Sequence, residues 1–157
     1  MRTIRKLTAM VVVMRTIRKG FTFIELIIAS LVFAIVAVLA IPSFSKMLAK
    51  QNLNSDIRSL ANVLTQGRSQ AVFLRKEIQI NFATGANTDT QYYWSINPQN
   101  KLISPATLSS LTFKKDGVLS AVTADIEFKL CNSKIEMTKN LILTKSGSIF
   151  YKADGTC

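Results

Sequence analysis

Hydrophobic and polar residues follow three different patterns along this chain. The first is an apolar run from Phe21 to Ile41, broken only by Thr22, Glu25 and Ser30. An α-helix of this length is about 31 Å long, which is enough to cross a hydrocarbon core of about 30 Å. The run therefore predicts one membrane-spanning helix.

The second pattern is a helical stripe, in which apolar residues recur every three or four positions. Gly67 takes the place expected between two of its members. We expect this face to pack on the segments that follow rather than to form a solitary coiled coil. A glycine inside a helix costs roughly 1 kcal/mol relative to alanine, and Gly67 would let a strand approach closely. The stripe consists of Leu53, Ile57, Leu60, Leu64, Ala71 and Leu74.

The third pattern begins at Ile78, where apolar and polar residues start to alternate as in half-buried antiparallel strands. Long polar loops are expected at Ala83 to Gln91 and at Asn97 to Ser109. The sum predicts an α+β protein, in which a long N-terminal helix packs on a small antiparallel β-sheet assembly. The predicted strands are Ile78–Phe82, Tyr92–Ile96, Val118–Val122, Ile126–Leu130, Ile135–Met137, Leu141–Thr144 and Ile149–Tyr151.

Positive charge is concentrated before the apolar run. The formal net charge is +11, and residues 1–20 hold six of the 20 basic residues and none of the nine acidic ones. The excess of Lys and Arg should keep this leader in the cytoplasm and send everything after Ile41 across the membrane. A conventional signal peptide fits less well, because its apolar region is usually about 7 to 15 residues long. A buried core helix is the other alternative.

Glu25 requires an explanation, because a carboxylate at membrane depth costs about 2.5 to 3.5 kcal/mol. The residues Lys19-Gly20-Phe21-Thr22-Phe23-Ile24-Glu25 resemble the type III signal of type IV pilins and pseudopilins. This resemblance implies that a prepilin peptidase cuts after Gly20 and methylates the new amino terminus at Phe21. It also implies that Glu25 pairs with the terminal amine of a neighbouring subunit, since a buried ion pair is tolerated where a lone charge is not.

Two further features belong to that resemblance. Thr22 completes the motif beside the cleavage point, and Pro42 matches the proline that commonly kinks the pilin helix. An alternative for Glu25 is a carboxylate that is stabilised by the helix dipole and remains hydrated near the membrane interface. That alternative explains one acid but not the ordered set of residues.

The segment from Gln66 to Ile80 resembles the passage from helix to first strand in the GspH/FimT (FimU-like) family of minor pilins and pseudopilins. The implied organisation is a basic prepilin leader at 1–20, a transmembrane and filament-core helix at 21–44, and a pilin domain at 45–157. Cys131 and Cys157, the only cysteines, would then lie outside the cytoplasm, where disulfides persist. We predict that they pair, as in the C-terminal loop of many pilins, with two free thiols as the alternative.

The expected function is structural. The resemblance implies a minor pilin that prepilin peptidase processes and that primes pilus assembly at the tip with other minor and major pilins. Before assembly it would be a single-pass protein of the bacterial inner membrane with its C-terminal domain in the periplasm. Two alternatives are a type II secretion pseudopilin and a FimT-like subunit that binds DNA for uptake. DNA is not the favoured partner, because lysines that alternate with acids are usually a solvated surface.

Enzymatic function is not expected. The chain contains no histidine, which removes Ser-His-Asp and Cys-His sites and His-ligated zinc, and we expect no cofactor or metal. The hexapeptide MRTIRK occurs at Met1 and again at Met14. We therefore expect Met14 to be a real or alternative start and residues 1–13 to be dispensable.

Overall fold

The computed structural model describes residues 20–157. The predicted leader, apart from Gly20, and both copies of the hexapeptide lie outside the described residues. The chain divides into two units, Met1–Leu39 and Ala40–Cys157. One helix, α1 (Phe23–Leu74), supplies most of the described part of the first unit and the N-terminal part of the second.

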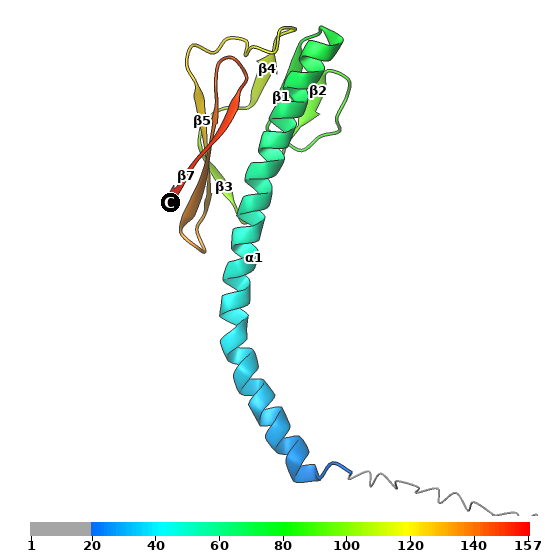
Figure 1. The fold of residues 1–157 in the computed structure, drawn as a ribbon, viewed down its shortest axis with the longest axis vertical. Helices are drawn as coiled ribbons and strands as arrows, with labels where there is room; N and C mark the ends of the chain where they lie inside the picture. Colours follow the sequence, from blue (N-terminus) through cyan, green and yellow to red (C-terminus); the bar gives the residue numbers. More distant parts are fainter. Residues whose placement is uncertain (1–19) are drawn as a thin grey trace, which may run out of the picture. The chain divides into compact units, whose positions relative to one another are not determined.

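The second unit contains two β-sheets beside the C-terminal half of α1 (Figure 1). The smaller sheet has the order β2-β1-β4 and the larger has the order β3-β5-β6-β7. This architecture confirms the predicted α+β fold class, in which a long helix is followed by a mainly antiparallel sheet assembly. The strands are β1 (Ile78–Asn81), β2 (Gln91–Tyr93), β3 (Lys101–Ser104), β4 (Ser110–Phe113), β5 (Ile126–Asn132), β6 (Met137–Leu143) and β7 (Ile149–Thr156).

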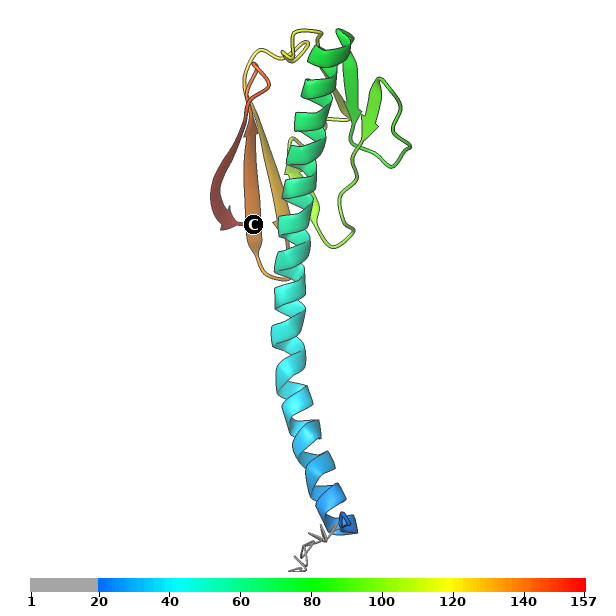
Figure 2. The ribbon, with the colours of Figure 1, turned by 45° about the vertical axis from the view of Figure 1, so that its right-hand side comes forward.

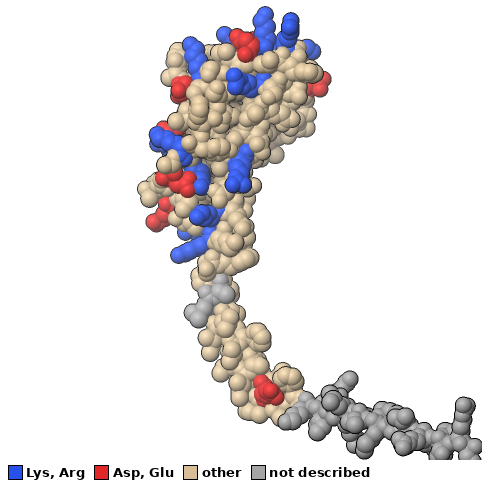
Figure 3. All heavy atoms as spheres, viewed as in Figure 1, with Lys and Arg blue, Asp and Glu red and all other residues tan. Residues whose placement is uncertain are grey.

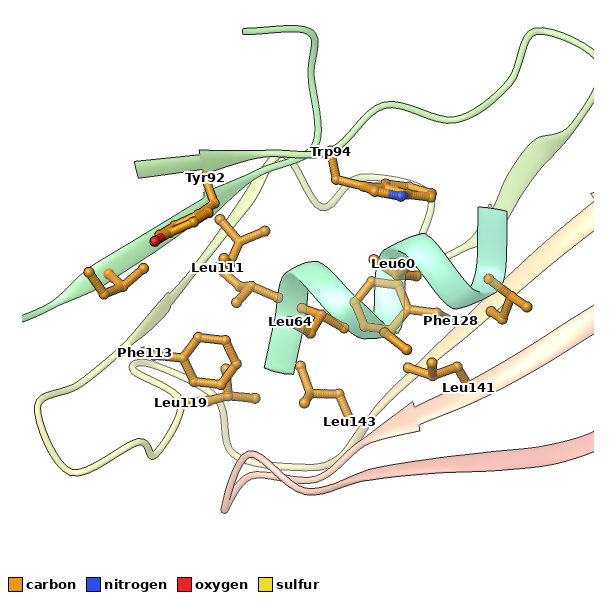
Figure 4. Close-up of a cluster of buried hydrophobic side chains, with 14 of the residues drawn as sticks. Leu60, Leu64, Tyr92, Trp94, Leu111, Phe113, Leu119, Phe128, Leu141 and Leu143 are labelled. Carbon is orange, nitrogen blue, oxygen red and sulfur yellow. The ribbon is translucent and has the colours of Figure 1, made fainter. Parts of the chain in front are cut away.

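The core lies where α1 meets both sheets (Figures 2 and 4). Five of the six residues of the predicted stripe are buried, and only Leu74, at the end of the helix, is partly exposed. Phe113, Phe128, Leu141 and Leu143 reach the same cluster from the strands. The apolar face of α1 and the apolar faces of the strands are therefore buried in one common core. This is the arrangement expected for a helix packed on a sheet.

Gly67 is buried at the gap in the stripe, and the smaller sheet approaches the helix there. A Cβ atom at this position would lie 2.5 Å from Cδ1 of Ile80 and 3.6 Å from Cγ2 of Ile78. Glycine at this position lowers the helix propensity but allows β1 to contact the helix closely, as the sequence predicted.

Two predicted strands differ from the structure for local reasons. Val118–Val122 is not a strand, because Ala121 adopts φ 58° and the segment keeps only a bridge between Leu119 and Phe113. Ile135 lies in the turn between β5 and β6, where Glu136 has φ 50°. A strand needs an extended backbone, and a residue in the left-handed conformation interrupts it.

The strand pairing also departs from the prediction. β1 and β2 pair in parallel, whereas the other four pairings are antiparallel within residues 20–157. β3 lies within the predicted loop Asn97–Ser109, and β4 directly follows it. β7 continues five residues beyond Tyr151. Alternation identifies which face of a strand is buried, but it carries no information about a strand's partner or direction.

The predicted disulfide is present and anchors the C-terminal strand. The Sγ atoms of Cys131 and Cys157 are 2.01 Å apart, and the two residues are separated by 26 positions in sequence. Closing a loop of this length contributes on the order of 3 to 4 kcal/mol in the chain-entropy treatment. The bond ties the end of β7, which is an edge strand, to β5.

Candidate functional site

The N-terminus of α1 is a capped first turn that contains both polar residues of the predicted signal. Oγ1 of Thr22 accepts a hydrogen bond of 3.3 Å from the backbone N–H of Glu25. The backbone oxygen of Thr22 accepts a bond of 3.2 Å from the N–H of Leu26. Thr22 is therefore the N-cap residue, and the spacing from Thr22 to Glu25 is that of a capping box. The polar residues thus set where the helix begins.

The carboxylate of Glu25 lies in this first turn, where the helix dipole stabilises a negative charge. This placement agrees with the helix-dipole part of the alternative explanation for Glu25, whereas hydration near a membrane interface remains a prediction. Within residues 20–157 the carboxylate makes no hydrogen bond or ion pair, so it is also available to a group from another molecule. The two roles are compatible, because a dipole lowers the cost of the charge without occupying its oxygens.

The first unit presents a nearly continuous apolar surface. Its helix is long and apolar enough to cross a membrane, and no residue of the most apolar window is buried. Glu25 is the one charged residue of the described part of this unit, and Figure 3 shows an acidic group there among uncharged atoms. Such a surface requires a bilayer or other helices to cover it. The large exposed side chains are Phe21, Phe23, Ile24, Leu26, Ile27, Ile28, Leu31, Val32, Phe33, Ile35, Val36 and Val38.

The remaining predicted positions flank this surface. Gly20 is exposed, and no described atom outside Gly20 and its chain neighbours lies within 4 Å of the place where a Cβ would stand. Pro42 lies inside α1, where it lacks the N–H that an i to i−4 bond requires. A kink at Pro42 remains a prediction, as do cleavage after Gly20 and methylation of Phe21.

Several charged side chains on the surface of the larger sheet form ion pairs with one another. Nζ of Lys152 lies 3.1 Å from Oε1 of Glu127, and Nζ of Lys139 lies 2.6 Å from Oδ2 of Asp154. The hydrogen bond from Lys152, together with the nearby charge of Lys129, holds the pKa of Glu127 below its ordinary value although desolvation opposes it. Exposed pairs of this kind contribute little stability, but they leave fewer free cations on the sheet.

A polar network that the sequence analysis missed joins α1 to the loop before β3. Oδ2 of Asp56 accepts hydrogen bonds from the N–H of Asn97, at 3.1 Å, and from Nδ2 of Asn100, at 2.7 Å. Oδ1 of Asn100 in turn accepts a bond of 2.6 Å from Nδ2 of Asn132 in β5. The available signal was that Asp56 is the one acidic residue of α1 after Glu25, but its partners are more than 40 positions away in sequence.

Replacing Asp56 by alanine should lower the free energy of unfolding of the domain by about 1 to 3 kcal/mol, because two donors lose their acceptor. The measurement is urea unfolding of the region from Ser45 onward, followed by the fluorescence of Trp94, the single tryptophan. Asp89→Ala is the matched control, since Asp89 is exposed and its side chain makes no hydrogen bond within the described residues. Equal effects of the two substitutions would contradict this role of Asp56.

No cluster of three or more Cys, Asp or Glu side chains that could hold a metal ion lies in the described part of the chain. The described features are a capped N-terminal turn, an exposed apolar helix and an α+β domain.

Comparisons with known proteins agree with this architecture. A family model, the prokaryotic N-terminal methylation motif, matches residues 15–41. The fold is similar to that of the type IV minor pilin FimU of Pseudomonas aeruginosa in two crystal forms. One match has 20% sequence identity and a TM-score of 0.54 and covers 66% of this chain and 90% of that chain. The other has 20% identity and a TM-score of 0.51, with coverages of 64% and 93%. No curated protein sequence matches.

Motif and fold agree with each other. The chain combines a prokaryotic methylation motif at residues 15–41 with a fold similar to that of a type IV minor pilin. The similarity of fold to the minor pilin FimU agrees with the resemblance seen in the sequence.

Proposed function

We propose that this protein is a minor subunit of a type IV pilus, made as a membrane-anchored precursor and processed between Gly20 and Phe21. The observation that carries the proposal is the capped N-terminal turn at the head of an exposed apolar helix, with a Glu25 carboxylate that makes no ion pair within residues 20–157. The helix would anchor the precursor in the inner membrane, with the C-terminal domain in the periplasm. After processing, the same surface would pack among the helices of other pilins.

In this mechanism Glu25 sets the register of assembly. Its carboxylate would meet the methylated amine of Phe21 of a neighbouring subunit in an apolar environment, where unpaired charges are costly. The role is structural, and the subunit would act in the group of minor pilins that primes the filament at its tip. Prepilin peptidase and the other pilins are therefore the proposed partners.

Replacing Glu25 by leucine should leave processing intact but reduce the amount of the protein in filaments by about tenfold or more. Removing the charge favours retention in the bilayer by about 2.5 to 3.5 kcal/mol and abolishes the pairing. Immunoblots of sheared filaments and of membranes measure the distribution. Ser30→Leu is the control, because it makes the same helix more apolar without touching the carboxylate. Wild-type incorporation of the Glu25 variant would contradict the proposal.

Two alternative roles have distinct tests. A type II secretion pseudopilin would be required for export of secreted proteins and not for piliation, so a gene deletion separates the two. DNA binding is not favoured, because Lys129, Lys139 and Lys152 lie in ion pairs with acidic side chains of the same sheet. A salt-sensitive shift of duplex DNA by the domain would favour it instead.

A further inference from the structure

A groove runs beside the free edge of the larger sheet, on a surface used by neither the N-terminal motif nor the core. β7 pairs only with β6, and seven of its eight residues are exposed. A hollow of about 330 Å³ lies between β7, β6 and α1, and its lining includes Asn54 and Arg58 of α1 and Tyr151 of β7. A second hollow of about 420 Å³ continues along α1 and shares Asn54 and Arg58. The two form one depression from the sheet edge onto the helix.

The side chains of α1 along this groove have the composition of a protein interface. Between Gln51 and Asn62, the part of the helix that lines the groove, there is no lysine and no glutamate, and the only charged residues are Asp56 and Arg58. Protein interfaces are depleted in lysine and glutamate and enriched in arginine and tyrosine, whereas solvated surfaces show the reverse. The side of the groove that β6 and β7 form differs from the helix, because Lys139, Lys152 and Asp154 lie there in ion pairs.

Arg58 is the one cation of the groove without a carboxylate partner within residues 20–157. Lys139 is paired with Asp154 and Lys152 with Glu127. The exposed guanidinium of Arg58 therefore remains open to an external carboxylate, which it can bind with two parallel hydrogen bonds. Tyr151, which is 62% exposed, offers an aromatic contact in the same groove.

The charge balance indicates what kind of molecule would fill the groove. From Phe21 onward the chain holds 14 basic and nine acidic residues, so a second copy is poorly matched to a cationic groove. We propose that the groove around Arg58 and Tyr151 is the docking surface for a neighbouring filament subunit of different sequence, which presents a carboxylate to Arg58. This inference rests on the proposed function, because it assigns the partner of a filament subunit.

The test places a photo-crosslinking amino acid, p-benzoylphenylalanine, at position 151 of the full-length chain in filament-producing cells. The control is the same residue at position 101, which is exposed on β3 at the opposite edge of the sheet. Sheared filaments are irradiated, and the adduct is identified by peptide mass spectrometry. We expect a covalent adduct from position 151, and none from 101, with another prepilin-type subunit at a peptide that contains Asp or Glu.

Charge variants connect the adduct to Arg58. Arg58→Glu should reduce the yield of the adduct about tenfold, because attraction becomes repulsion at the contact. Arg58→Gln should reduce it less, and Lys101→Glu should leave it unchanged. Replacing the acidic residue of the cross-linked peptide by arginine should restore the adduct of Arg58→Glu.

Three results would overturn the inference. The first is an adduct between position 151 and either a second copy of this chain or a protein that is not a filament subunit. The others are equal yields of adduct from positions 151 and 101, and an unchanged yield in the Arg58→Glu variant. Filaments that contain the chain but give no adduct would contradict the assignment of the groove as a docking surface and leave the proposed function standing. Absence of the wild-type chain from filaments would overturn the proposed function, and the partner with it.

Discussion

Replacing Phe128 by alanine should lower the free energy of unfolding of the domain by about 3 to 5 kcal/mol. Phe128 is fully buried in β5, and its ring centroid lies 5.6 Å from that of Phe82. Phe82 in turn contacts Trp94 edge-on at 6.1 Å. Truncation leaves a cavity where the helix and both sheets meet. Domains are stable by only about 5 to 15 kcal/mol, so this substitution removes a large share of the total.

Urea unfolding of the region from Ser45 onward, followed by the fluorescence of Trp94, measures this effect. Phe150→Ala is the matched control, because Phe150 is also on a strand of the larger sheet but is 57% exposed. The control should change the unfolding free energy by about 0.5 kcal/mol or less. A cost below about 1 kcal/mol for Phe128→Ala would contradict the assigned core.

Replacing Gly20 by valine should block processing while leaving the fold unchanged. No described atom outside Gly20 and its chain neighbours lies within 4 Å of a Cβ at this position, so any loss must arise in recognition by the peptidase. A pocket that accepts glycine must accommodate three additional carbon atoms, and differences of one methylene already change rates by about 10- to 200-fold. Valine should therefore slow cleavage by a factor at or beyond the upper end of that range.

Immunoblots that separate precursor from mature chain measure this processing over time. Thr22→Ser, which keeps the hydroxyl that caps α1, is the control and should be cleaved at a rate close to that of the wild type. Rapid cleavage of the Gly20 variant at the same bond would show that glycine is not what the peptidase recognises.

The helix and the core were the most predictable parts of this structure. The stripe from Leu53 to Ala71 and the gap at Gly67 identify the buried face, because a helical period maps directly onto one side of α1. The alternation from Ile126 to Leu130 identifies β5 for the same reason. Local periodicity is sufficient wherever a residue's environment depends on the geometry of its own element.

Features that depend on distant pairing were not predictable from periodicity. The contact of Asp56 with Asn97 and Asn100 joins segments more than 40 positions apart. The parallel pairing of β1 with β2 and the short strand β3 depend on neighbouring strands rather than on their own sequences. The left-handed conformation of Ala121 ended a predicted strand, and nothing in an alanine predicts that conformation.

The N-terminal site was accessible to sequence reasoning in part. The order of Gly20, Thr22 and Glu25 identified the motif, and the matching methylation model agrees with it. What the sequence did not reveal is that Thr22 and Glu25 also form the cap of α1. One pair of residues thus serves the start of the helix and, as we propose, the assembly of the filament.

Intact-mass analysis of the protein from cells with and without prepilin peptidase tests the central claim most directly. With the peptidase, the account predicts a mature chain that begins at methylated Phe21 and is two protons lighter than the reduced chain because of the Cys131–Cys157 bond. Without the peptidase, the precursor should persist with its leader attached. An uncleaved chain of the same mass in both kinds of cell would contradict the account.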